Sequence, residues 1–148
     1  MKIAIACDHR GYEAKRRLLP VLKNWGHELE DFGCETPASC DYPNFAVPVS
    51  RSVASGKNEV GILLDGTGIG MSVAANKVRG IRAALVHDYV TARTAREKNH
   101  CNVLCLGTDL LSEDQVRKIV EIFLTTPWTD GRHTKRVEMV MEIEKNGT

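Results

Sequence analysis

Residues 60–70 read VGILLDGTGIG, and this stretch decides the predicted fold. Val60 to Leu64 form the strongest buried-strand pattern in the chain, a run of apolar residues broken only by one glycine. A glycine-rich loop follows Asp65, and Met71 to Lys77 have the pattern of a helix start. A buried strand that leads through a tight loop into a helix is the repeating unit of a parallel α/β sheet.

Strands and helices alternate along the rest of the chain as well. Further strand patterns cover residues 2–7, 27–32, 81–86 and 103–106. Amphipathic helical patterns cover residues 11–25, a segment that ends at Ser55, and residues 88–98, 112–124 and 131–145. The sequence therefore predicts an α/β fold, a three-layer sandwich in which helices cover both faces of a five-stranded parallel sheet. The chain has 148 residues and no repeat or linker, so we expect a single domain over residues 1–148.

The charge balance limits the classes of partner. Twenty Lys and Arg residues oppose nineteen Asp and Glu residues, and a net charge of +1 creates no field that would hold nucleic acid or an anionic membrane. The N-terminal apolar run ends at Asp8, too early for a signal peptide, and no run approaches the roughly 20 apolar residues of a membrane span. We therefore expect a cytoplasmic protein that binds any anion through a local site.

The five cysteines are odd in number and scattered, without a CxxC pair. This spacing favours reduced thiols over a disulfide framework or a zinc site, and we assign no residue to a metal. Cys101 and Cys105 border the fifth strand and are predicted to pack in the core.

Three polar clusters border the predicted strands. They are Asp8-His9 after the first strand, Asp65 to Gly70 after the central strand, and Asn99 to Asn102 just before the fifth strand, with Lys98 beside it. Ligands of open parallel sheets bind at the carboxyl ends of the strands. We therefore expect the three clusters to converge at one edge of the sheet.

The loop Gly66-Thr67-Gly68-Ile69-Gly70 has three interpretations. Its backbone N–H groups and the positive end of the following helix can cradle a small anion. A dinucleotide site is less favoured because the spacing is GxGxG rather than GxGxxG, although the acidic Asp88 does follow the next strand. The third interpretation is a tight turn without a ligand.

Two further groups also have both a functional and a structural reading. Asp65 ends an apolar strand, where a carboxylate is costly to bury unless it caps the next helix or takes part in chemistry. Asp8-His9 is either a functional pair or a satisfied loop pair.

A basic cluster near the C-terminus consists of Arg132, His133 and Arg136. Two guanidinium groups on one helical face suit a phosphate dianion. The alternative is a solvated face that pairs with Glu138 and Asp130.

Several motifs resemble, in order and spacing, those of the ribose-5-phosphate isomerase B family, which includes galactose-6-phosphate isomerase subunits. They are CDHRGYEAK at 7–15, DYP at 41–43, GILLDGTGIGMSVAANKVRGIRAA at 61–84, Asn102-Val103-Leu104 with Gly107, and GRHTKRVE at 131–138. The resemblance covers nearly the whole chain. It implies a Rossmann-like or flavodoxin-like sandwich and an aldose–ketose isomerase of a sugar phosphate that uses no metal or cofactor. It also implies a homodimer or tetramer whose active sites are shared between subunits.

The resemblance also implies roles for single residues. Asp8 and His9 would contact the sugar and phosphate, Tyr42 would line the site, and the backbone of residues 66–70 would stabilise an enediolate oxygen. Asn99 would bind substrate. The phosphate would be gripped by Arg132 and Arg136 of the partner subunit, with His133 beside them.

This sequence departs from the family pattern at three positions. Asp65 replaces the usual catalytic cysteine, and we predict that it is the proton-abstracting base. Lys98 replaces the ring-opening histidine, so that Lys98 or His100 opens the ring, or the substrate arrives open. Asp109 replaces a frequent arginine and removes a positive charge near the substrate.

The leading hypothesis is an isomerase of ribose 5-phosphate and ribulose 5-phosphate that works through an enediolate. An isomerase of allose 6-phosphate, galactose 6-phosphate or a tetrose phosphate is the first alternative. A non-catalytic sugar-phosphate-binding protein is the second, and a nucleotide-binding module is the least favoured.

Overall fold

The computed structural model describes residues 1–147, which form one parallel sheet and the helices around it. The strands are β1 (Lys2–Cys7), β2 (Glu28–Asp31), β3 (Val60–Asp65), β4 (Ala83–Val86) and β5 (Val103–Gly107). The helices are α1 (Tyr12–Asn24), α2 (Pro43–Ala54), α3 (Ile69–Ala75), α4 (Tyr89–Glu97), α5 (Glu113–Thr125) and α6 (Arg132–Asn146). Among these residues, no helix is both long and apolar enough to cross a lipid bilayer.

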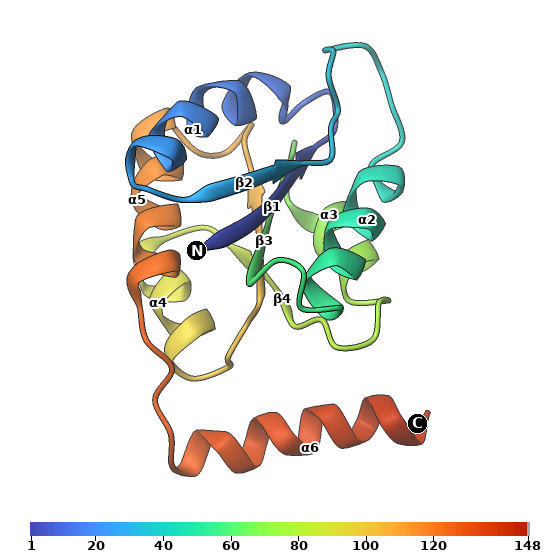
Figure 1. The fold of residues 1–148 in the computed structure, drawn as a ribbon, viewed down its shortest axis with the longest axis vertical. Helices are drawn as coiled ribbons and strands as arrows, with labels where there is room; N and C mark the ends of the chain where they lie inside the picture. Colours follow the sequence, from blue (N-terminus) through green and yellow to red (C-terminus); the bar gives the residue numbers. More distant parts are fainter. Residues whose placement is uncertain (148) are drawn as a thin grey trace.

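The sheet has the strand order β2-β1-β3-β5-β4, and every pairing is parallel. Helices α1, α4 and α5 cover one face, and α2 and α3 cover the other (Figure 1). The predicted α/β sandwich with a five-stranded parallel sheet is therefore confirmed. The chain leaves β1 for β2 on one side and returns to β3 on the other, so the order of the strands reverses between β1 and β3.

The core consists of two apolar layers that share the sheet. On the α1, α4 and α5 side, Ile62 and Leu64 of β3 pack near Phe123 of α5. On the other side, Leu63 packs near Met71 of α3. Every residue of β3 is buried, which explains why its sequence is continuously apolar rather than alternating. This packing fixes the position of Asp65, the last residue of the strand.

Most element boundaries lie within two residues of the predicted ones, and the differences have local causes. The strand predicted from residue 81 begins at Ala83, because the Arg82 backbone N–H donates to Asn102 Oδ1 at 2.8 Å. Asp88, considered above as a ribose-binding acid, caps α4 by accepting a hydrogen bond from the Thr91 backbone N–H at 2.7 Å.

Helix α6 lies apart from the sandwich at the end of an extended connection (Figure 1). None of its residues is buried. The Glu144 carboxylate accepts hydrogen bonds from the Gly80 backbone N–H at 2.9 and 3.0 Å, which ties α6 to the turn before β4. Met139, Val140 and Ile143 are each more than half exposed, so α6 presents an apolar surface that its own chain does not cover.

Candidate active site

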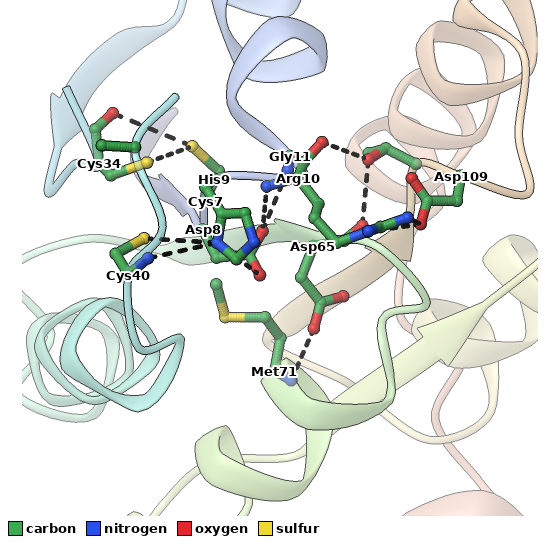
Figure 2. Close-up of polar contacts among 12 residues, drawn as sticks. Cys7, Asp8, His9, Arg10, Gly11, Cys34, Cys40, Asp65, Met71 and Asp109 are labelled. Carbon is green, nitrogen blue, oxygen red and sulfur yellow. Dashed lines mark hydrogen bonds and ion pairs between the residues drawn. The ribbon is translucent and has the colours of Figure 1, made fainter. Parts of the chain in front are cut away.

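The first polar cluster lies where β1 and β3 end side by side, at the reversal of strand order. The Asp8 backbone N–H donates to Leu64 O at 3.1 Å, so Asp8 and Asp65 leave neighbouring strands at the same edge. Figure 2 shows the two carboxylates near His9 and Arg10. This is the place where open α/β sheets bind ligands, and the structure brings together the first two clusters predicted from the sequence.

Asp65 is only 5% exposed and is held by the start of α3. Its Oδ1 accepts a hydrogen bond from the Gly68 backbone N–H, and its Oδ2 accepts one from the Met71 backbone N–H at 3.3 Å. Burial raises the pKa of Asp65, and the nearby carboxylates of Asp8 and Asp109 raise it further. The two backbone hydrogen bonds oppose the shift but do not cancel it. Asp65 is therefore both a helix cap and a carboxylate of increased basicity.

The glycines of the loop after Asp65 are required by close packing. Gly68 has a φ of +79°, and a Cβ there would lie 2.3 Å from Leu85 Cδ1. A Cβ on Gly70 would lie 2.8 Å from the Tyr42 ring. The loop is therefore a tight turn, but this packing role does not exclude that its backbone also binds a ligand.

The same loop also contains backbone N–H groups that donate no hydrogen bond within the described part of the chain. Within residues 1–147, the backbone N–H groups of Gly66, Thr67 and Gly70 have no acceptor, whereas that of Ile69 donates to Thr67 Oγ1 at 3.3 Å. Open N–H groups beside a buried carboxylate can stabilise an oxygen that becomes negative near that carboxylate.

Asp8 and His9 are ordered by their own loop and by the segment before α2. Asp8 Oδ1 accepts hydrogen bonds from the backbone N–H groups of Arg10 at 2.8 Å and Gly11 at 3.1 Å. The Cys40 backbone N–H donates to His9 Nδ1 at 3.4 Å, so the neutral ring carries its proton on Nε2. Nε2 has no hydrogen-bond partner among residues 1–147, so it is available to a ligand.

Tyr42 is the N-cap residue of α2, and its ring lies against Gly70. It is 38% exposed and borders the loop at Gly70, whereas Arg10 and Asp109 border it at Gly66. The structure thus places Tyr42 with the first cluster, as expected.

The expectation for the third cluster is wrong, because Asn99 to Asn102 lie at the other edge of the sheet. The Gly61 backbone N–H, at the beginning of β3, donates to Asn102 O at 2.9 Å. A segment that precedes a parallel strand lies at its amino end, whereas Asp65 follows the carboxyl end of β3. Lys98, Asn99 and His100 are therefore separated from Asp65 by the length of the sheet within one chain.

A second cluster forms instead at this amino edge. A groove of about 450 Å³ between α4, the start of β4 and α6 is lined in part by Lys98, Asn99, His133 and Arg136. Desolvation, and the positive charges of Arg132, Arg136 and Lys98, lower the pKa of His133. The carboxylate of Glu97 opposes this shift, so the groove holds several positive charges with one negative charge nearby, an arrangement that suits an anion.

His100 is held away from this groove by an aromatic contact. Its ring stacks on Trp128 with centroids 4.7 Å apart, and its backbone has a φ of +48°. Burial, with Arg82 and Arg96 nearby, lowers the pKa of His100. Lys98, by contrast, lines the groove.

Arg10 is a residue of this edge that the sequence pattern did not single out. Its Nε donates to Asp109 Oδ2 at 2.7 Å across 99 positions of sequence, so the negative charge of Asp109 is paired. The only available signal was its position directly after Asp8-His9. Within residues 1–147, no group of His, Cys, Asp and Glu side chains has the arrangement of a metal site.

Comparisons with known proteins agree with this architecture. The family model described as Ribose/Galactose Isomerase matches residues 3–140. Ribose-5-phosphate isomerase B of Escherichia coli is 38% identical over 97% of both chains. The structure of Clostridium thermocellum ribose-5-phosphate isomerase B superposes with a TM-score of 0.98 at 44% identity over the whole of both chains. That of a Thermotoga maritima ribose 5-phosphate isomerase gives 0.92 at 45% identity, over 95% of this chain and 97% of the other. The resemblance found in the sequence is confirmed, and the chain belongs to the ribose/galactose isomerase family of enzymes.

Proposed function

We propose that the protein interconverts ribose 5-phosphate and ribulose 5-phosphate through an enediolate, with Asp65 as the base. The observation that carries the proposal is the buried Asp65 carboxylate, whose pKa is raised, beside the open N–H groups of Gly66, Thr67 and Gly70. Family membership and the names of the relatives support the reaction class and the substrate.

The reaction needs a base that can both take and return a proton. Asp65 removes the proton from C2 of the open aldose, and the electron pair forms the enediolate while the C1 carbonyl becomes the oxyanion. The open backbone N–H groups stabilise this charge. Asp65 then returns the proton to C1 while the hydroxyl proton on O2 passes to O1, which leaves a carbonyl at C2 and a hydroxyl group at C1. A carboxylate with a raised pKa suits this exchange, because its proton affinity lies closer to that of the reacting carbon acid.

The remaining groups of the proposed site come from a second copy of the chain. Asn99, Arg132, His133 and Arg136 lie far from Asp65 in their own chain, so they can act only across a dimer. The exposed apolar side chains of α6 support such a contact. In this arrangement Arg132 and Arg136 bind the phosphate. Lys98 is better supported than His100 as the acid that opens the ring, since it lines the groove while His100 stacks on Trp128.

The free thiols support a reducing compartment, for which we propose the cytoplasm. Cys7, Cys34, Cys40, Cys101 and Cys105 are all unpaired.

The first test is an NMR assay of the purified protein with ribose 5-phosphate, allose 6-phosphate and galactose 6-phosphate, in separate reactions without added metal. We expect conversion of the pentose phosphate. Turnover of a hexose phosphate alone would identify the departures at positions 65, 98 and 109 as changes of specificity. No turnover of any sugar phosphate would contradict the proposal.

The second test is D65N. We expect kcat to fall by about 10² to 10⁴-fold while sugar-phosphate binding is retained, because the amide cannot accept the proton. D114N, at an exposed position early in α5, is the matched control and should keep wild-type kcat. In the wild type, kcat/KM should fall at low pH through a pKa above 3.8, the ordinary value of an aspartate. Retained turnover in D65N would overturn the assignment of the base.

A further inference from the structure

The ion pair between Arg10 and Asp109 lies directly on the loop that follows the proposed base. Arg10 Nε and Nη2 both donate to Asp109 Oδ2, the former at 2.7 Å. A Cβ built on Gly66 would lie 2.7 Å from Arg10 Nε and 2.7 Å from Asp109 Oδ2. The guanidinium is therefore in van der Waals range of Gly66, the residue next to Asp65. Figure 2 shows the Arg10 side chain reaching Asp109.

Three loops meet at this arginine. Its backbone N–H donates to Asp8 Oδ1 at 2.8 Å, and its carbonyl oxygen accepts a hydrogen bond from Thr108 Oγ1 at 3.2 Å. The Asp109 backbone N–H donates to Gly66 O at 3.1 Å. Backbone and side chain of Arg10 are thus each anchored by a separate carboxylate. Such double anchoring fixes a flexible side chain before any ligand arrives.

Three carboxylates lie near Arg10, so an anionic substrate can approach this edge of the sheet only if a cation offsets their negative charge. Asp8 and Asp109 both raise the pKa of Asp65, which means that three carboxylates lie close together. A sugar phosphate is an anion and would be repelled by them. The Arg10 side chain is 58% exposed, and its Nη1 has no acceptor within residues 1–147. A guanidinium with unused donors can bind phosphate oxygens.

We propose that Arg10 binds the phosphate of the substrate from the chain that carries Asp65, and that Asp109 is the positioning residue that holds its guanidinium. This inference rests on the proposed function, because it takes a sugar phosphate as the ligand. A purely structural ion pair is the competing explanation, but an exposed pair of this kind contributes little to stability. Phosphate affinity therefore separates the two explanations.

The experiment uses inorganic phosphate as the probe, titrated calorimetrically into the purified protein in a phosphate-free, low-salt buffer. R10Q should weaken phosphate binding by about tenfold or more, since a charge-assisted hydrogen bond is lost. R10K should recover part of the affinity. With ribose 5-phosphate, R10Q should raise KM and change kcat little, because Arg10 holds the end of the substrate that does not react.

R17Q is the matched control, because Arg17 makes a similarly exposed ion pair with Glu113 at 2.9 Å between α1 and α5. It should leave phosphate affinity, KM and kcat unchanged. The role of Asp109 is tested by introducing R10Q into the D109N variant. The loss of phosphate affinity caused by R10Q should be smaller in D109N than in the wild type. Equal costs in the two backgrounds would contradict the role of Asp109.

Wild-type phosphate affinity in R10Q would overturn the proposal for Arg10, and so would undetectable phosphate binding by the wild type. Neither result depends on turnover. If the wild type isomerises none of the sugar phosphates, the proposed function fails, while the titration still decides whether Arg10 binds phosphate.

Discussion

The two polar clusters of the molecule are held in opposite ways. At the carboxyl edge, Asp8 and Asp65 each accept two backbone hydrogen bonds from the residues that follow them. At the amino edge, Lys98 and Arg136 line an open groove, and no carboxylate pairs with either within residues 1–147. The two carboxylates of the first cluster are therefore hydrogen-bonded within their own chain, whereas the cations Lys98 and Arg136 of the second have no ion-pair partner within residues 1–147. In the proposed function, both clusters therefore contribute: the carboxyl edge supplies the base, and the amino edge supplies the ring-opening acid and the phosphate-binding arginines.

The largest expected effect comes from pairing two variant subunits in one dimer, each altered at a different polar cluster. D65N and R136A homodimers should each be nearly inactive at low substrate concentration. In co-expressed mixtures, a heterodimer contains one site in which both halves are intact, so about a quarter of all sites should work. Steady-state assays of the mixtures measure the recovery, and in purified heterodimers half of the sites should work. Pairing D65N with D8A, where both changes affect the same edge, should give no recovery. A lack of recovery with R136A as well would show that the two clusters do not share a site.

The next effect concerns the amino-edge cations alone. R136A should raise KM for the sugar phosphate by about 10- to 100-fold with little change in Tm, since the arginine is exposed and binds phosphate through charge-assisted hydrogen bonds. R51A, at an exposed position of α2, is the control and should match the wild type in both measurements. A fall in Tm with an unchanged KM would instead make Arg136 a structural residue.

A smaller effect tests how the carboxyl edge is held. D8A leaves the backbone N–H groups of Arg10 and Gly11 without their acceptor, and should reduce the free energy of unfolding by about 1–3 kcal/mol. D41A removes an exposed carboxylate just before α2 and should cost less. Urea denaturation gives both values, and equal stability of D8A and the wild type would mean that this loop does not depend on Asp8.

The smallest effect is the pH dependence of stability. The pKa of Asp65 is raised in the folded state, so this carboxyl group favours folding below 3.8, and that contribution is lost as the pH rises through the folded-state pKa. The wild type should therefore lose stability relative to D65N as the pH rises over this window. The hydrogen bond that asparagine cannot accept adds only a constant offset. A stability difference that grows in favour of the wild type with rising pH would mean that the backbone hydrogen bonds outweigh burial.

The local hydrophobic pattern of the sequence was sufficient to predict most of the fold and the polar residues at the carboxyl edge of the sheet. The apolar run that ends at Asp65 has to be a buried strand, and a polar residue at its end has to lie at an edge of the sheet. The failure at Asn99 to Asn102 came from ignoring strand direction, since residues before and after a parallel strand lie at opposite edges. The pairing of Arg10 with Asp109 could not be predicted from sequence, because it depends on how two loops 99 positions apart meet in space.

The isolation of α6 has a consequence for the behaviour of the protein on dilution. A helix of 15 residues with none of them buried is marginal by itself in water. Its order must come from whatever covers Met139, Val140 and Ile143. If a second copy does so, mass action governs that order, and dissociation removes the phosphate-binding cations from the partner's base. Specific activity should then decline at low protein concentration, even though every Asp65 keeps its local environment.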